Sequence, residues 1–118
     1  MIIPNAIKAL INVDMIGGMG LRLMYDLNST QQLRDLVWRV ARRRGYATHF
    51  PIEPKRRIGD DHIPFADIGI HAVNLIDVEY GPGNGFWHTN EDSPDKLSTH
   101  SFGMIADVLV GVLEALAP

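Results

Sequence analysis

Leu10-Ile11-Asn12-Val13-Asp14-Met15-Ile16 is the stretch of sequence that decides the fold. It is short, mainly apolar and rich in β-branched residues, and it ends at Gly17-Gly18, so it predicts a buried β-strand. Residues 21–26 roughly alternate between apolar and polar side chains and predict a second strand after this glycine-rich turn. Residues 72–76, Ala-Val-Asn-Leu-Ile, predict another buried strand. Strands as apolar as these are typical of a largely buried sheet.

Two segments carry the spacing of amphipathic helices. In residues 30–44, apolar side chains recur at the i, i+3, i+4, i+7 spacing of one helix face. The polar run 28–30 can cap the start of this helix, and Gly45 can end it. Residues 98–116 predict the second helix, with its own serine or threonine cap. Its expected buried stripe consists of Phe102, Ile105, Ala106, Leu109, Leu113 and Leu116.

The order of these elements predicts an α/β fold. Strands and helices alternate, with one helical turn expected within residues 60–68, which favours a small layered sandwich on a short, mostly parallel sheet with two main helices. At 118 residues, the chain is expected to form a single domain, residues 1–118. So small a sheet leaves open edges and apolar surface that self-association can cover. We therefore expect a homodimer or a larger homo-oligomer.

Composition narrows the functional classes. Apolar residues make up 46% of the chain, which is enough for a packed core. The chain has no cysteine, so a disulfide scaffold and a thiolate zinc site are excluded. Any metal would be held by His, Asp or Glu, a ligand set that suits zinc. We expect no signal peptide in this chain and no apolar run long enough to cross a bilayer, hence no membrane partner; the compartment itself is not predicted.

The charges are distributed unevenly. Residues 1–59 carry a net charge of +6 and residues 60–118 a net charge of −9. A basic patch can bind nucleic acid or another anionic ligand; alternatively, the two halves attract each other within or between chains. No aromatic residues interleave the arginines of residues 39–44, as base-stacking platforms would require. The second interpretation is therefore favoured, and nucleic acid is not expected as a partner.

A second unusual stretch is Gly85-Phe86-Trp87-His88-Thr89-Asn90-Glu91-Asp92-Ser93-Pro94. Two aromatic side chains, a histidine and a carboxylate-rich turn are more typical of a functional site than of a plain surface loop. His88 is the first candidate, because an imidazole between Trp87 and a polar turn can bind a metal or carry a proton.

Acidic residues supply further candidates for a functional site. Asp14 stands near the C-terminal end of a predicted strand, where ligand sites of α/β sheets collect, although an Asp there can also simply cap the following turn. Asp60-Asp61-His62 places two carboxylates beside an imidazole; the alternative is that they only cap the helical turn that Pro64 enters. The remaining histidines are expected to be surface or satisfied residues: His49, His71 and His100.

Three segments together resemble a known family. Residues 12–17 (Asn-Val-Asp-Met-Ile-Gly), 60–65 (Asp-Asp-His-Ile-Pro-Phe) and 87–89 (Trp-His-Thr) resemble, in this order, the C-terminal half of the zinc-dependent aminopeptidase and glutaminyl cyclase superfamily. The second and third segments favour the cyclase branch, whereas the tail 91–97 (Glu-Asp-Ser-Pro-Asp-Lys-Leu) is also common in the peptidases. The resemblance covers almost the whole chain and implies a truncated phosphorylase/hydrolase-like zinc-peptidase fold.

The resemblance also implies roles for individual residues. His88 resembles a zinc ligand. Asp14 resembles either a ligand of the second zinc in a two-metal aminopeptidase or an acid beside the single zinc of a cyclase. Asp61 resembles a catalytic carboxylate that hydrogen-bonds within the cyclase site, and Trp87 the wall of its substrate pocket. His62 is a further candidate metal ligand. The implied activity is zinc-dependent chemistry on the amide or ester bonds of small substrates.

The chain departs from the family at its N-terminal side. The family's other metal ligands and its general base lie upstream of the Asp14 motif, and only thirteen residues precede Asp14 here. His71 stands where the family usually has proline. Three interpretations follow: an inactive, oligomerising fragment; an anion-binding module that uses the arginine-rich helix; or, favoured here, a hydrolase whose reduced site is rebuilt from Asp14, Asp61, His62 and His88.

Overall fold

Two separate two-stranded parallel sheets are present in the computed structural model, which describes residues 6–78, 89–90 and 93–117. β1 (Leu10–Asp14) pairs with β4 (Ala72–Ile76), so that Asp14 lies opposite Ile76 at the carboxyl ends of both strands. Every residue of β4 is buried. The predicted α/β class, the parallel sheet and the strand at residues 72–76 are confirmed.

The second strand is shorter than predicted. β2 (Tyr25–Asp26) pairs in parallel with β3 (Lys55–Arg56), whereas the predicted strand covered residues 21–26. The preceding residues bond to two different segments. Met24 N donates to Ile76 O at 2.8 Å, and Leu23 N donates to His49 O at 2.8 Å. Because successive residues bond to different neighbours, no continuous ladder forms before Tyr25.

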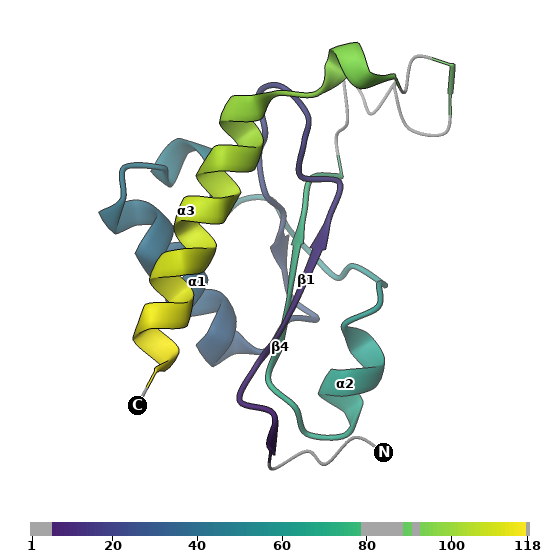
Figure 1. Ribbon diagram of the computed structural model, residues 1–118. Helices are drawn as coiled ribbons and strands as arrows, with labels where there is room; N and C mark the ends of the chain where they lie inside the picture. Colours follow the sequence, from purple (N-terminus) through teal and green to yellow (C-terminus); the bar gives the residue numbers. More distant parts are fainter. Residues whose placement is uncertain (1–5, 79–88, 91–92, 118) are drawn as a thin grey trace.

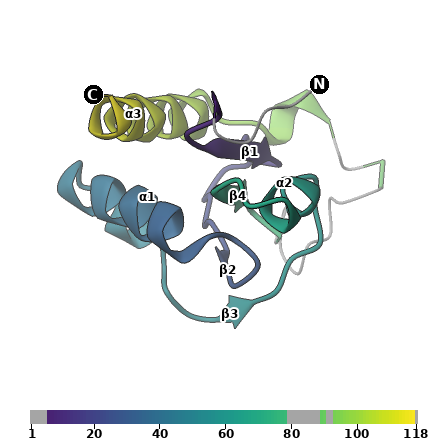
Figure 2. The same ribbon diagram turned by 90° about the horizontal axis from the view of Figure 1, so that it is seen from below.

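Three helices flank the sheet. α1 (Gln31–Arg43) and α3 (Thr99–Leu116) lie side by side on one side of the strands, and the short α2 (Ile63–Asp67) lies on the other side of β4 (Figure 1; Figure 2). They match the helices predicted near residues 30–44 and 98–116 and the helical turn predicted within residues 60–68. Two single-turn 3-10 helices, Ala47–His49 and Pro94–Lys96, complete the described elements.

The start of α1 is tied to β4 by side chains from the predicted cap. Thr30 is the N-cap residue, but its side chain does not cap the helix. Its Oγ1 instead accepts a hydrogen bond from Ala72 N at 2.9 Å, and Ser29 Oγ accepts one from Asn74 N at 2.9 Å. The other end agrees with the sequence: Gly45 follows α1 with a φ of +88°, which glycine adopts without strain.

The core lies between the strands and the pair formed by α1 and α3. Trp38 is its largest member, and its ring meets those of Tyr25 and Phe50 edge-on at centroid distances of 5.6 Å and 5.2 Å. The indole N–H donates to Pro51 O at 3.1 Å. Other buried core side chains are Leu21, Leu23, Leu33, Val37, Ala41, Val73, Leu75, Met104, Ile105, Val108 and Val112.

α3 buries a face that overlaps only in part with the predicted one: Ile105 is buried, and Leu109 and Leu116 pack partly buried against the core. Phe102 and Leu113, both expected in the core, are 44% and 61% exposed, and Ala106 is exposed as well. α3 is apolar around most of its circumference, so apolar spacing alone does not select a face. The contact with α1 selects it, because a Cβ added to Gly111 would lie 2.6 Å from Cγ1 of Val40. Its buried residues are Ser101, Met104, Ile105, Val108, Gly111 and Val112.

α3 also corrects an expectation about membranes. In the described part of the chain it is the one helix with the length and apolar composition needed to cross a membrane, although no such run was expected. Core helices of globular proteins share these properties, and α3 contacts α1 along its buried face. The chain is compact, with a Cα radius of gyration of 14.5 Å.

Ion pairs between α1 and α3 join the basic and acidic halves of the chain. Arg44, just after α1, pairs with Asp107 and, at 3.7 Å, with Glu114. The Tyr46 hydroxyl donates to Asp107 at 2.8 Å. This hydrogen bond, assisted by Arg44, lowers the pKa of the Asp107 carboxyl. Attraction within the chain is therefore one consequence of the uneven charge.

Candidate functional site

Asp14 ends β1 with its carboxyl group against that of Asp60. The two carboxyl groups lie close enough for their interaction to raise the pKa of Asp14. Partial burial, followed by the hydrogen bond with Asp60 and the charges of Asp60 and Asp61, raises the pKa of Asp14. A backbone hydrogen bond from Met15 acts in the opposite direction. Met15 itself turns the chain with a φ of +55°, an uncommon value for a residue other than glycine.

A raised pKa of Asp14 is the expected result of this contact. Two ionised carboxylates repel and have no donor to offer each other, whereas a protonated carboxyl donates to an ionised neighbour. Oδ2 of Asp60 is buried and has no hydrogen-bond donor in the described part of the chain. A proton on Asp14 would supply such a donor. The contact with Asp60 thus favours the protonated form of Asp14.

Asp60, and not Asp61, provides the carboxylate that meets Asp14. Asp61 was the residue selected from the sequence, but its side chain is exposed. Its backbone N–H donates to Oδ1 of Asp60 at 2.8 Å, and its charge reaches Asp14 only through space. Adjacent side chains point in different directions, so the sequence allowed only one of the two acids to face the end of β1. The catalytic role of Asp61 stays a prediction.

His62 lies inside the protein. Its side chain is fully buried, and its Nε2 lies 2.8 Å from Oδ2 of Asp26, which is also buried. Nδ1 of His62 has no hydrogen-bond partner in the described part of the chain. A histidine buried against an aspartate in this way packs the start of α2 onto β2. This placement gives no support to the predicted metal-binding role of His62.

Asp26, which the sequence analysis did not single out, anchors the segment that carries Asp60. Together with His62, it holds this segment on both sides of Asp60. The sequence could have indicated Asp26, because this carboxylate stands at the end of a predicted strand, as Asp14 does. Three further hydrogen bonds reach the Asp26 carboxylate: from Asn28 N at 2.9 Å, Ile58 N at 2.8 Å and Ser29 Oγ at 2.8 Å.

A buried polar chain continues from Asp26 to β1. Ser29 Oγ, which donates to Asp26, also accepts from Asn74 N in β4. Oδ1 of Asn74 accepts from Nδ2 of Asn12 in β1 at 2.9 Å. The anchor of Asp60 and the strand that carries Asp14 therefore belong to one connected network.

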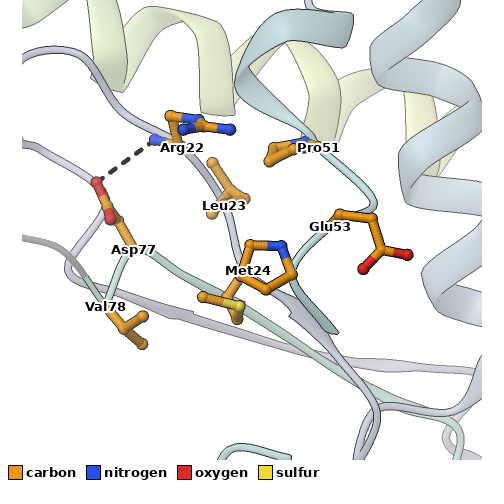
Figure 3. Close-up of a pocket in the computed structure, with 8 residues that line it drawn as sticks. Arg22, Leu23, Met24, Pro51, Glu53, Asp77 and Val78 are labelled. Carbon is orange, nitrogen blue, oxygen red and sulfur yellow. Dashed lines mark hydrogen bonds between the residues drawn. The ribbon is translucent and has the colours of Figure 1, made fainter. Parts of the chain in front are cut away.

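A small cavity opens at the carboxyl end of β4. Figure 3 shows Arg22, Met24, Glu53 and Asp77 around it, with the Arg22 N–H donating to Oδ2 of Asp77 at 3.4 Å. Its volume is about 50 Å³, which accommodates a few water molecules and no peptide side chain of ordinary size. The cavity lies at the sheet edge where α/β proteins bind ligands.

The remaining predicted site residues, Trp87 and His88, lie outside the described residues, and their roles stay predictions. Among the residues that are described, no group of three or more His, Asp or Glu could hold a metal ion. A catalytic zinc normally has three protein ligands. The described residues alone therefore do not fit a zinc site.

The sequence matches one family model over most of its length. Residues 4–113 match the model of peptidase family M28. The chain belongs to peptidase family M28. The resemblance inferred from the three sequence segments is thereby confirmed. No curated protein matches this M28 chain.

Solved structures related to this M28 chain share its fold. A glutaminyl cyclase from an Acidobacteriales bacterium is 33% identical, with a TM-score of 0.89 over 95% of this chain and 40% of that chain. A glutaminyl cyclase from Fimbriiglobus ruber is 30% identical, with a TM-score of 0.82 over 94% of this chain and 37% of that chain. A Zn-dependent exopeptidase from Parabacteroides distasonis is 24% identical, with a TM-score of 0.77 over 94% and 41%, and shows the fold alone. The M28 chain thus spans about two-fifths of the length of these structures.

Proposed function

We propose that this chain is part of a metal-dependent enzyme that acts on amide or ester bonds of small substrates, with Asp14 and Asp60 as its proton carrier. The observation that carries the proposal is the contact between these two carboxyl groups at the carboxyl end of β1, with the pKa of Asp14 raised. Membership of family M28 and the similarity to two glutaminyl cyclases support this class of reaction.

The carboxyl pair suits reactions in which a proton moves to a leaving nitrogen. Hydrolysis of an amide by water releases an amine. Cyclisation of an N-terminal glutamine forms a bond from the amino nitrogen to the side-chain carbonyl carbon and releases ammonia. In both reactions the attacking group loses a proton and the leaving nitrogen gains one. Asp14 and Asp60, sharing one proton, can accept the first and deliver the second.

We also propose zinc as a cofactor, with ligands outside the residues that the structure describes. His88 is the ligand that we propose from this chain, and further ligands must come from residues outside the described set. A bound zinc ion would polarise the carbonyl group that is attacked. The proton-carrying role proposed for Asp14 and Asp60 rests on the contact between their carboxyl groups and on the raised pKa of Asp14.

Two neighbouring aspartates provide a matched test. The protein is supplied with zinc and assayed for hydrolysis of an aminoacyl amide and for ammonia release from a peptide with N-terminal glutamine. Asp60→Asn should lower turnover about 10²–10⁴-fold, the usual contribution of a general acid–base group. Asp61→Asn should lower it far less, because the exposed Asp61 side chain acts on Asp14 only through its charge. Full turnover in Asp60→Asn, or none in the wild type, would contradict the proposal.

A second candidate function is a structural part that acts through self-association. α3 leaves Phe102, Val110 and Leu113 at least 44% exposed. Within residues 6–78, 89–90 and 93–117, β1 pairs with β4 alone, and Val13 of β1 is 40% exposed. An open strand edge beside apolar side chains favours association. We propose a homodimer or larger assembly, and a monomer at high concentration in analytical ultracentrifugation would contradict it.

A further inference from the structure

Two histidines that the proposed function does not use lie close together. His49 ends the 3-10 helix Ala47–His49, and His100 lies in the first turn of α3. Their ring centroids are 6.2 Å apart, and the ring planes make an angle of 63°. These elements are distinct from β1 and the 58–62 segment, which carry Asp14 and Asp60.

One hydrogen bond fixes the ring of His49. Its Nδ1 lies 2.7 Å from the carbonyl oxygen of Leu21, a residue with no exposed surface. A carbonyl oxygen can only accept, so Nδ1 carries a proton and Nε2 of the neutral ring presents a lone pair. Metal-binding histidines are commonly oriented in this way, with the second ring nitrogen donating to a backbone carbonyl. His49 is therefore prepared to act as an Nε2 ligand.

His100 can adjust its position to share a ligand with His49. Its side chain is exposed and forms no hydrogen bond or ion pair with any other residue in the described part of the chain. A metal ion at about 2.0–2.1 Å from one nitrogen of each ring would hold the two centroids roughly 5–6 Å apart. The observed separation of 6.2 Å is close to this range. Rotation of the exposed His100 ring has to close the remaining difference.

We propose that His49 and His100 form a two-histidine site for a divalent transition metal, with water completing the coordination. Imidazole nitrogen is a preferred ligand of Zn²⁺, Cu²⁺ and Ni²⁺. The site adds a metal-binding function that is separate from the reaction proposed above. The competing explanation is that the two rings only pack against each other and bind nothing.

Titration with ZnCl₂, followed through the ring ¹⁵N signals of the histidines, distinguishes these explanations. The signals of His49 and His100 should shift together and saturate at one ion per chain. His49→Gln and His100→Gln should each lower the zinc affinity at least tenfold. His71→Gln is the matched control, because His71 is also exposed but precedes β4, and it should keep the wild-type affinity.

A further variant separates this site from the proposed catalytic zinc. In His88→Ala, the His49 and His100 signals should still saturate with unchanged affinity, whether or not the catalytic proposal holds. Loss of this response in His88→Ala would overturn the inference, as would signals of His49 and His100 that do not respond to zinc. Because His100 is exposed, His100→Gln should fold normally, and an unchanged affinity in that variant would also overturn it.

Discussion

Asp26 and His62 are buried together, with Nε2 of His62 2.8 Å from Oδ2 of Asp26 and neither side chain more than 1% exposed. The pair joins β2 to the start of α2. Residues 58–62, which carry Asp60 to Asp14, are held at both ends by Asp26: through Ile58 N and through His62. The geometry of the candidate site therefore depends on two residues that do not touch the Asp14–Asp60 pair by any described contact.

Asp26→Ala should destabilise the protein by about 3–5 kcal/mol, the usual effect of removing one partner from a buried polar or ionic pair. The substitution leaves His62 and two backbone N–H groups, those of Asn28 and Ile58, without their acceptor. The free energy of unfolding is measured by urea denaturation. Asp35→Ala is the control, because Asp35 is exposed. Similar small losses in both variants would show that Asp26 is not an anchor.

Asp14→Asn should stabilise the protein at neutral pH. Because folding raises the pKa of Asp14 above its ordinary value of 3.8, ionisation of Asp14 opposes folding. This cost is absent below pH 3.8, where the group is protonated in both states, and it grows as the pH rises through the folded pKa. The gain should not exceed about 1 kcal/mol, since the pair is only partly buried.

Melting temperatures of wild type and Asp14→Asn, measured from about pH 3 to pH 8, check this expectation. The two curves should coincide at the acidic end and separate as the pH rises. Asp61→Asn should give a smaller separation, because Asp61 acts on Asp14 only through its charge. A wild type that is more stable than Asp14→Asn at neutral pH would show that the pair does not store a proton.

Two glycines of α3 should respond to alanine in opposite directions. At Gly111, a Cβ would lie 2.6 Å from Cγ1 of Val40, and such overpacking costs about 1–3 kcal/mol. That cost outweighs the gain of about 1 kcal/mol in helix propensity. At Gly103, no atom lies within 4 Å of the added Cβ, so only the gain remains. Urea denaturation of Gly111→Ala and Gly103→Ala should give a loss and a gain of stability, respectively.

The two faces of α3 can be compared in the same way. Met104 is buried, so Met104→Ala should cost about 2–5 kcal/mol. Leu113 is 61% exposed, so Leu113→Ser should change the free energy of unfolding by no more than about 0.5 kcal/mol. Sedimentation should show weaker self-association for Leu113→Ser than for the wild type. Equal association of the two would place the proposed contact elsewhere.

The sequence predicted the positions of helices and strands better than the sides on which they are buried. The strand at residues 72–76 and both long helices were predictable because apolar spacing, caps and Gly45 are local signals. The buried face of α3 was predicted only in part, because a mostly apolar helix offers little local contrast between its sides. The contact at Gly111 chooses the face, and it depends on Val40 in another helix.

The candidate site was predictable only in part. Asp14 became a candidate because a carboxylate at a strand end is a local signal, and the 60–62 segment because acids and a histidine adjoin. Which of Asp60 and Asp61 meets Asp14 depends on how Asp26 holds the segment, and that contact spans 32 residues at Ile58. The roles proposed for Trp87 and His88 stay predictions.

The parallel pairing of β1 with β4 also affects how the chain folds during its synthesis. Asn12 and Asn74, which join the two strands by a side-chain hydrogen bond, are separated by 62 residues. During synthesis on the ribosome, β1 emerges long before its described partner strand exists. At typical translation rates this interval lasts roughly 3–12 s. Throughout that time the apolar residues of β1 are exposed in a nascent chain, so this protein is expected to depend on chaperones more than one built from local pairings.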